Sequence, residues 1–247
     1  NMRSNLPKIV STKYVVVQRV YDIVTGIRFT KKERAAFQAK SALGKGPAVQ
    51  IDTLRVSIAR QYVAEKENKI VFLGDSKYNI PGLLNKSGIN SVSVADGAAG
   101  TGAAKKLWIN KTPKEILEDL LIAKDVIESG NVFSAKALVL TPSAMARLRR
   151  PYSDANPVPL ITWLKENITF DKILVSNQMA TANNGLGVDC FLMMDDSPEV
   201  AQIVITSDLS LGEPIYDILG TSEQVVEESI AGTIIRHPSA IYVGKGI

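Results

Sequence analysis

The stretch FLGDSKYNIPGLLN, residues 72–85, stops a long helical pattern and turns the chain back. The pattern begins at Pro47, because proline is favoured in the first turn of a helix. A helix over 47–73 would span about 40 Å at about 1.5 Å per residue. Gly74-Asp75 and Pro81-Gly82 break the pattern and predict turns. Apolar residues recur at helical spacing on two stripes, which predicts two buried faces: Ile51, Leu54, Ile58 and Tyr62 on the first, and Val56, Ala59, Val63 and Ile70 on the second.

The composition is ordinary for a soluble globular protein. Of the 247 residues, 45% are hydrophobic and 22% are charged, enough for a core in one domain or two closely connected ones. No run approaches the roughly 18 apolar residues of a membrane-spanning helix, and no signal-peptide order is visible. The net charge of +4 is too small to indicate a nucleic-acid-binding domain, although it allows a basic inner surface. Cys190 is the only cysteine, which excludes an internal disulfide and a thiolate metal cluster within one chain.

Two helix starts carry strong signals. Thr30 and Glu33 have the spacing of a capping box, so a helix should run to about Ala42. Thr112-Pro113-Lys114-Glu115 opens a helix that Gly130 ends. The stripe expected to be buried on this second helix consists of Ile116, Leu120, Ala123 and Ile127.

The remaining elements mix strands and helices without regular βαβ alternation. Residues 86–111 are rich in small side chains, which indicates a hairpin or a mobile surface loop. The resulting class is α+β. Strands are predicted at 8–29, 136–140, 172–176, 188–194, 200–206 and 225–243, the last interrupted at His237-Pro238, and further helices after Thr141-Pro142 and at 160–166.

Residue types that could carry chemistry are scattered along the chain. His237 is the only histidine and precedes a proline in a predicted strand, a setting more typical of structure than of catalysis. Asp195-Asp196 could bind a divalent cation, but neighbouring carboxylates at a strand end are usually solvated. Gly100-Thr101-Gly102 with Lys105-Lys106 lacks the order of a phosphate-binding loop. We therefore predict no catalytic, cofactor-binding or metal site.

The densest cationic cluster is Arg147, Arg149 and Arg150, followed by Pro151-Tyr152. Arginine next to an aromatic ring can bind phosphate and stack on bases. A contact between subunits or a solvated face explains the same residues equally well. The sequence leaves these alternatives open.

Three blocks of the chain stand in a recognisable order. They are the long helix running into FLGD and GLLN at 72–85, PEVAQIVITSDLS at 198–210, and GTIIRHPSAIYVGKGI at 232–247. With these blocks the chain resembles the major capsid proteins of tailed bacterial viruses that have the Hong Kong 97 type of fold. Each motif alone is moderately specific, and three in register are much stronger. The resemblance spans most of the chain from about Tyr14 onward.

The resemblance implies a capsid fold with an extended β-arm, a long spine helix with a peripheral sheet, and a mixed α/β axial domain. Residues 1–29 would be the N-terminal segment and part of the extended loop. Residues 30–111 and 220–247 would form the peripheral domain, with the spine helix at 47–73. Residues 112–219 would form the axial domain.

In this family the extended loop reaches over a neighbouring subunit, which would correspond here to Lys8–Phe29. Arm exchange would tie neighbours together through strand pairing. Packing of the spine helix is expected from the first stripe, Ile51, Leu54, Ile58 and Tyr62. Contacts between subunits are expected from Tyr14, Val16, Arg19, Tyr21 and Arg28 on the arm and from Arg147, Arg149 and Arg150.

The implied function is a major capsid protein that self-assembles into an icosahedral virus head enclosing the DNA genome. A closed container needs many copies of one chain but no catalytic residues, so no enzymatic activity and no cofactor are expected. The expected partners are other copies of the chain in pentamers and hexamers, and packaged double-stranded DNA held by non-specific phosphate contacts. Portal, scaffold or decoration proteins are further partners that the resemblance allows, and a membrane is not expected. The expected location is the virion, after assembly in the host cytoplasm.

One departure from the family lies at the start of the chain, which begins Asn1-Met2. Family members usually carry an N-terminal arm and a first strand of the extended loop. The seven residues before Lys8 cannot supply both. Either an upstream piece is removed during maturation, or the sequence is an abbreviated form.

Two other functions compete with a virus head. An encapsulin uses the same fold to enclose a cargo enzyme, and the turn at 82–84 and the helix start at 112–115 recur there, whereas the C-terminal block favours the viral shell. An enzyme using Asp195, Asp196 or Glu227-Glu228 as acid and base would need a cleft that pushes their pKa values apart. A monomeric enzyme would elute near 26.7 kDa, whereas a shell protein would appear as particles or as pentamers and hexamers.

Overall fold

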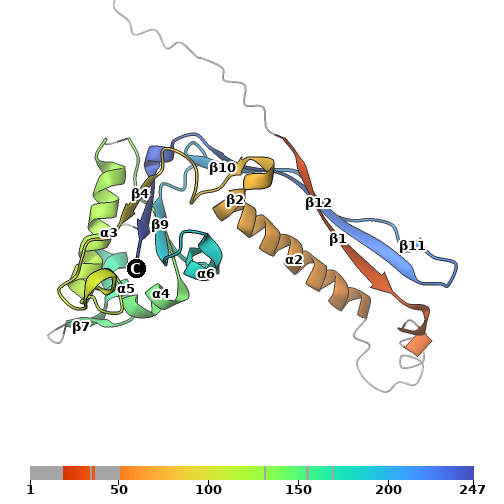
Figure 1. The fold of residues 1–247 in the computed structure, drawn as a ribbon, viewed down its shortest axis with the longest axis horizontal. Helices are drawn as coiled ribbons and strands as arrows, with labels where there is room; N and C mark the ends of the chain where they lie inside the picture. Colours follow the sequence, from red (N-terminus) through yellow and green to blue (C-terminus); the bar gives the residue numbers. More distant parts are fainter. Residues whose placement is uncertain (1–18, 34, 37–50, 131, 154–155, 169) are drawn as a thin grey trace, which may run out of the picture.

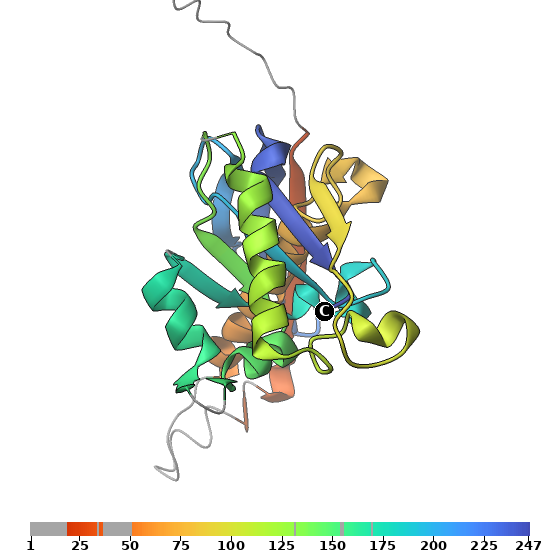
Figure 2. The same ribbon diagram turned by 90° about the vertical axis from the view of Figure 1, so that its left-hand side faces the viewer.

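A computed structural model shows a globular body from which a long arm extends (Figure 1). The structure describes residues 19–33, 35–36, 51–130, 132–153, 156–168 and 170–247. The arm holds the spine helix α2 (Ile51–Leu73) beside a sheet of long strands, and the body holds a second sheet with most of the other helices (Figures 1 and 2). This mixture confirms the predicted α+β class. No helix in the described part of the chain is long and apolar enough to cross a membrane.

Helix α2 ends at Leu73, as FLGDSKYNIPGLLN predicts, whereas residues 47–50 lie outside the described part. A short antiparallel hairpin follows, made by β2 (Gly74–Asp75) and β3 (Ile80–Pro81). A 3-10 turn, Ser76–Tyr78, joins the two strands, and Asn79 ends this turn in the left-handed conformation. The hairpin therefore reverses the chain directly at the helix end.

The returning loop caps the helix. The last carbonyl groups of any helix lack partners within it, and a buried end needs donors from elsewhere. Here consecutive residues of the loop supply those donors, so the loop continues the hydrogen bonding of the helix. Leu83 N donates to Val71 O at 2.9 Å, Leu84 N donates to Phe72 O at 2.9 Å, and the side-chain amide of Asn85 donates to Leu73 O.

Gly82 is the residue that allows this close return. A Cβ at this position would lie 2.3 Å from the nitrogen of Gly74 and 2.4 Å from the carbonyl oxygen of Phe72. Real Cβ atoms do not approach backbone atoms that closely. The Gly82 N–H also donates to Asn85 Oδ1 at 2.7 Å, which orients the capping amide. The glycine is thus required by close approach of two backbone segments.

The arm sheet has the strand order β1-β12-β10, with β11 paired to β12. All pairs are antiparallel, and β1 pairs with β12 along its whole length, from Tyr21 opposite Ile230 to Phe29 opposite Ser222. Helix α2 covers one face of this sheet, where Ile27, Phe29, Ala59, Val63 and Val226 form a small core. The strand bounds are β1 Tyr21–Phe29, β10 Ala201–Leu211, β11 Ile215–Tyr216 and β12 Ser222–Ile235.

The body sheet has the order β4-β13-β9-β5-β8 and is mixed. Strands β4 and β13 are parallel, as are β5 and β8, and the other neighbours are antiparallel. Both faces are buried: Phe191 and Met193 join one core cluster, while Cys190 and Leu192 join another. Burial on both faces explains continuous apolar runs such as CFLMM. The bounds are β4 Asn90–Ser93, β5 Ala137–Leu140, β8 Lys172–Val175, β9 Cys190–Met194 and β13 Ile241–Lys245.

The predicted helix starts are confirmed. Thr112 and Glu115 form a full capping box at α3 (Pro113–Glu128), and the stripe expected to be buried there is buried. The Thr141 side chain caps α4 (Pro142–Leu148), and α5 (Leu160–Asn167) lies where a helix was expected. The Thr30–Glu33 box is also present, with Thr30 N donating to Glu33 Oε2 at 3.0 Å and residues 31–33 and 35–36 helical.

The structure corrects the prediction of a hairpin or a mobile surface loop at residues 86–111. The hairpin alternative is wrong, because β4 pairs in parallel with β13, about 150 residues later in the chain. The rest of the segment is a loop with one 3-10 turn, Gly102–Lys105, and it buries Trp108. A partner so distant in sequence leaves no local signal.

The two sheets also cut across the expected division at 219/220. Strand β10, from the segment 112–219, lies in the arm sheet, and β13, from 220–247, lies in the body sheet. The break at His237-Pro238 is confirmed by a 3-10 turn between β12 and β13. The remaining elements are the β6–β7 hairpin (Pro151–Ser153 and Asn156–Pro159), the 3-10 turn Asn177–Met179, α6 (Thr181–Asn184) and the 3-10 turn Pro238–Ala240.

Candidate assembly surfaces

The two apolar stripes of α2 have different surroundings. The second stripe faces the arm sheet, and its members Ala59 and Val63 are buried. The expectation that both stripes are buried is therefore corrected for the single chain. The side chain of Ile51 lies outside the described part, and the other members of the first stripe are exposed: Leu54 by 52%, Ile58 by 57% and Tyr62 by 45%.

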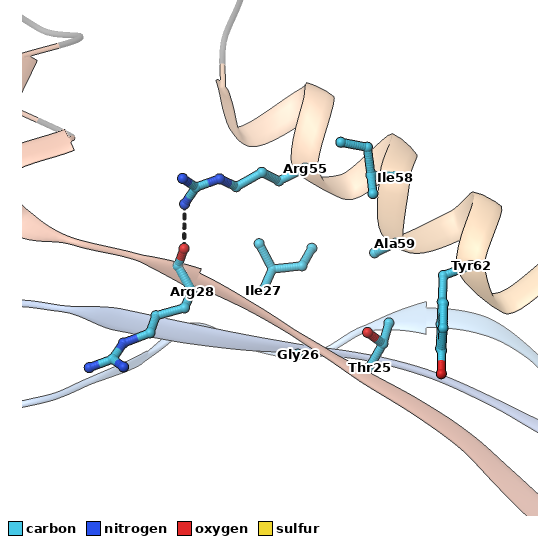
Figure 3. A pocket seen from close by; sticks show the side chains of 8 residues that line it. All are labelled: Thr25, Gly26, Ile27, Arg28, Arg55, Ile58, Ala59 and Tyr62. Carbon is cyan, nitrogen blue, oxygen red and sulfur yellow. Dashed lines mark hydrogen bonds between the residues drawn. The ribbon is translucent and has the colours of Figure 1, made fainter.

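A groove of about 310 Å³ runs between this exposed side of α2 and strand β1 (Figure 3). Tyr62 extends from the helix towards the strand, Ile58 lies along the helix, and Ile27 points from the strand towards the helix. The groove is therefore mainly apolar, with the guanidinium of Arg55 at one end, whereas the Arg28 side chain leaves β1 on the side away from α2. Its lining residues are Thr25, Gly26, Ile27 and Arg28 from β1, and Arg55, Ile58, Ala59 and Tyr62 from α2.

Arg55 holds the end of the groove together. Its guanidinium donates to the backbone oxygen of Arg28, pairs with Glu33 at 2.6 Å, and lies 5.0 Å from the centroid of the Phe29 ring. The hydrogen bond from Arg55, with those from Thr30, lowers the pKa of the Glu33 carboxyl to about 2. Arg28 is more exposed and has only a 3.5 Å contact with Glu223. The Arg28 side chain is thus available to a further carboxylate.

The end of the β10–β12 hairpin presents a second apolar surface. Ile218 is fully exposed, Leu219 is 76% exposed and Ile215 is 70% exposed. Asp217 N donates to Thr221 O at 2.8 Å, and Leu219 N donates to Asp217 Oδ1 at 2.8 Å. We call residues 213–220 the hairpin tip. It is a turn held by its own hydrogen bonds that carries apolar side chains into solvent.

A third apolar surface lies on α3. Its exposed side carries Leu121, Ile122 and Val126, which are 38%, 46% and 39% exposed. This helix lies on the side of the body that faces the viewer in Figure 2, away from the arm. The chain thus presents apolar surface at both ends.

Of the predicted arm contacts, Tyr14 and Val16 lie outside the described residues. Arg19 is exposed before β1. Tyr21 lies against Tyr78, with ring centroids 4.5 Å apart, and its hydroxyl donates to the Tyr78 carbonyl at 3.0 Å. Residues 21–29 are not a free arm within the chain, because every one of them pairs with β12.

The predicted arginine cluster lies at the end of α4. Arg147 is half-buried, and Arg149 and Arg150 are exposed. Next to them, the rings of Tyr152 and Trp163 stack with centroids 5.6 Å apart and planes at 10°. Arg147 lies in the last turn of α4 and Arg149 at its C-cap, and the role of the three arginines stays a prediction.

The titratable residues that were considered as catalytic candidates take part in packing, hydrogen bonds and ion pairs within the fold. His237 packs on Phe133 with ring centroids 5.2 Å apart, and burial raises the pKa of the Cys190 thiol to about 11. Asp195 accepts hydrogen bonds from the backbone of Ser134 and Ser197, and Asp196 pairs with Lys172 at 2.5 Å. Within the described ranges, no three His, Cys, Asp or Glu residues form a group that could hold a metal ion.

Glu227 and Glu228 do not form a carboxylate pair. Consecutive strand residues point to opposite faces, and only Glu228 is buried. Burial raises the pKa of Glu228 above its ordinary value, and the charges of Glu67 and Asp208 raise it further. This acid therefore faces α2 and β10, while Glu227 faces solvent.

Sequence reasoning missed the hairpin tip and the exposed side of α3. The signal was present at the tip, where Pro214 and Gly220 mark a loop that contains four apolar residues, Ile215, Tyr216, Ile218 and Leu219. Apolar side chains in a tight turn have no place in the core of a single chain. Such residues indicate an interaction surface.

The chain matches the family described as Major capsid protein over residues 1–247. No curated protein matches the sequence. Among solved structures, the capsid of the Myoviridae phage XM1 is similar, with a TM-score of 0.74 and 11% identity over 93% of this chain and 74% of that one. A virus-like particle from Pyrococcus furiosus has a TM-score of 0.61 and 20% identity over 94% of this chain and 80% of that one.

An encapsulin from Synechococcus elongatus PCC 7942 is also similar, with a TM-score of 0.54 and 14% identity over 92% of this chain and 74% of that one. These structural likenesses confirm the predicted Hong Kong 97 type of fold, which phage capsids and encapsulins share. The family match favours the capsid proteins over the encapsulins, because it is to the capsid proteins and covers the whole chain. The chain belongs to the major capsid protein family and is a capsid shell protein.

Proposed function

We propose that this shell protein assembles into a closed icosahedral head that encloses double-stranded DNA and has no enzymatic activity. The observation that carries the proposal is the match to the major capsid protein family over residues 1–247. Assembly in the host cytoplasm and the presence of DNA are parts of the proposal that rest on this family membership. Portal, scaffold and decoration proteins would be partners in the same head.

The placement of apolar surface supports assembly with several neighbours. The exposed stripe of α2 and the hairpin tip lie on the arm, and the exposed side of α3 lies on the body (Figures 1 and 2). A two-fold dimer would cover one self-complementary patch and leave the others in water. Heterologous contacts on different faces instead extend into rings and closed lattices.

The arm and the body correspond to the peripheral and axial parts of such a subunit. In this proposal β10 belongs with the arm and β13 with the body, because β10 pairs within the arm sheet and β13 pairs within the body sheet. Arg19, Tyr21 and Arg28 would lie at contacts made by the arm. Arg147, Arg149 and Arg150 would lie at contacts made by the body.

Contact with DNA would be non-specific. The chain carries 29 basic and 25 acidic residues, and a small positive excess repeated over every copy favours phosphate without reading sequence. Such binding weakens steeply as salt rises, because counterions are released when phosphates are neutralised. Non-specific contacts of this kind suit a container that must also release its genome.

Electron microscopy of the purified protein tests the proposal. Closed shells far larger than the 26.7 kDa chain are expected, and a strictly monomeric protein at high concentration would overturn it. The contents separate a head from an encapsulin. Nuclease-protected DNA in shells produced with the other virion proteins is expected, whereas a protected enzyme without DNA would favour the cellular compartment.

A further inference from the structure

The inner face of α2 carries one acidic residue between two cores. Ala59 and Val63 pack in the small core of the arm, and Val71 packs in the core beneath the body sheet. Glu67 lies four residues after Val63 and four before Val71, so it shares their side of the helix, and it is half-buried. The helix therefore presents a carboxyl to the sheet at a position where the spacing predicts an apolar residue.

Strand β12 has a matching interruption below the helix. Val226, Glu228 and Ile230 alternate along the strand, so their side chains point to the same face. Val226 belongs to the arm core that α2 covers, which identifies this face as the one below the helix. Val226 and Ile230 are completely buried, and Glu228 is only 6% exposed. An acid thus occupies a core position between two apolar residues.

Strand β1 brings no charge to Glu228 on this face. Ile23 lies directly opposite Glu228 in the ladder. The nearest acid of β1 is Asp22, which accepts a hydrogen bond from the Ser229 hydroxyl at 2.6 Å on the other face of the sheet. Tyr21, the next titratable side chain on the face below α2, donates its hydroxyl to the turn that follows the helix. The side of Glu228 towards β1 is therefore apolar.

The charges that act on Glu228 from α2 and β10 are acidic. They are Glu67 on the helix and Asp208 in the irregular stretch of β10. Arg60 and Lys66 flank the inner face of α2 and are exposed. Among the described residues, no hydrogen bond or ion pair reaches the Glu228 carboxyl. Glu228 is therefore a buried acid with like charges nearby and no cation bound to it.

Such a carboxyl links the packing of α2 to proton binding. A buried charge without a partner is costly, whereas the neutral acid is far cheaper to bury. Burial raises the pKa of Glu228 above its ordinary value of 4.5, and Glu67 and Asp208 raise it further. A group whose pKa is raised by folding contributes stability that is fully present below its ordinary pKa. That contribution is lost as the pH rises through the raised pKa.

We propose that Glu228 is a pH-dependent switch in the contact between α2 and the arm sheet. When Glu228 carries its proton, the helix packs over a neutral side chain. When the proton leaves, the carboxylate repels Glu67 and Asp208 and draws water into the contact. The middle of the spine helix then becomes its least protected part. The switch acts within one subunit, so it goes beyond the proposed shell function and does not depend on it.

Glu228→Gln tests the switch, with Glu227→Gln as the matched control, because Glu227 is the preceding residue and is exposed. Urea unfolding of dissociated, full-length subunits is followed from about pH 4 to about pH 8. Near the upper pH, Glu228→Gln should unfold at a higher urea concentration than the wild type. The two midpoints should converge as the pH falls towards 4.5, where the wild-type acid is also neutral. Glu227→Gln should show no gap that changes with pH.

Three results would overturn the switch. A gap between Glu228→Gln and the wild type that is equal at every pH would show that packing of the amide, and not loss of charge, changes stability. A lower midpoint for Glu228→Gln near pH 8 would show that the carboxylate is favourable in the fold. The same pH-dependent gap in Glu227→Gln would assign the effect to the net charge of the strand.

Hydrogen exchange gives a second readout, which needs only the wild type and a variant on the helix. Protection of the amides at 63–71, relative to the intrinsic exchange rate at each pH, should fall in the wild type as the pH rises above 4.5. Glu67→Gln removes one repelling charge, so this fall should be smaller. Protection that does not fall in the wild type, or falls equally in Glu67→Gln, would contradict the proposal even if Glu228→Gln does not fold.

Discussion

The Nζ of Lys111 lies 2.5 Å from Oδ2 of Asp119, and both side chains are almost completely buried. The indole N–H of Trp108 donates to the same oxygen at 2.9 Å. Burial raises the pKa of the Asp119 carboxyl above its ordinary value, although Lys111 and Trp108 oppose that rise. The pair ties the long loop before α3 to the first turns of that helix.

Breaking this pair should destabilise the body strongly. Lys111→Met leaves a buried carboxylate without its cation and should lower the free energy of unfolding by about 3–5 kcal/mol. The double variant Lys111→Met/Asp119→Leu should recover most of that loss, because no buried charge remains. Denaturant unfolding of disassembled subunits measures both. A double variant as unstable as the single one would contradict this account.

Gly82→Ala should disrupt the end of the spine helix. The new Cβ would lie 2.3 Å from Gly74 N, so the loop must move and its bonds to the helix end must lengthen. We expect a loss of about 3 kcal/mol or more in the free energy of unfolding. Gly130→Ala is the matched control, since a Cβ there meets nothing within 4 Å. Equal unfolding midpoints for the two variants would show that the close approach is unimportant.

Neighbouring leucines on α3 should separate folding from assembly. Leu120 is completely buried, so Leu120→Ala should cost about 2–5 kcal/mol of subunit stability. Leu121 is exposed, and Leu121→Ala should change subunit stability by less than about 0.5 kcal/mol. If the exposed side of α3 is a subunit contact, Leu121→Ala lowers particle yield instead. Unfolding curves and sedimentation of particles together read out both effects.

Acid should release the link between Glu33 and Arg55. The pKa of Glu33 is lowered from 4.5 to about 2, so its contribution is present above its ordinary pKa and is lost as pH falls from about 4.5 towards 2. The protection of backbone amides from hydrogen exchange, relative to the intrinsic exchange rate at each pH, should therefore fall in that window at residues 30–33 and in the first turn of α2. Glu33→Gln should exchange faster at neutral pH and lose the acid dependence. If Glu33→Gln lost protection in the same pH window, the change would have to come from another titrating group.

Local signals predicted the elements well, because helix caps act within one turn. The Thr112–Glu115 box, the Thr141 cap and the stop at Leu73 are all set by neighbouring residues. Strand partners were not predictable in this way. The pairing of β4 with β13 depends on where a distant strand lies, and residues 90–93 carry no mark of it.

The assembly surfaces were predictable only in part, for a related reason. Periodicity shows that a side of a helix is apolar, but not whether the same chain covers it. The stripe with Leu54 and Ile58 has the same spacing as the stripe with Ala59 and Val63, and only the second is buried. Apolar residues that pack on a second copy look like core residues in one sequence.

The junction between the arm and the body has a mechanical consequence. Val71, at the end of α2, and Leu83 and Leu84, in the returning loop, are all buried in the core cluster beneath the body sheet. Turning the arm relative to the body would expose these side chains and break the bonds that cap the helix. The joint between the arm and the body is therefore rigid. In a lattice built from this subunit, the fixed angle between the arm and the body of each copy sets the curvature.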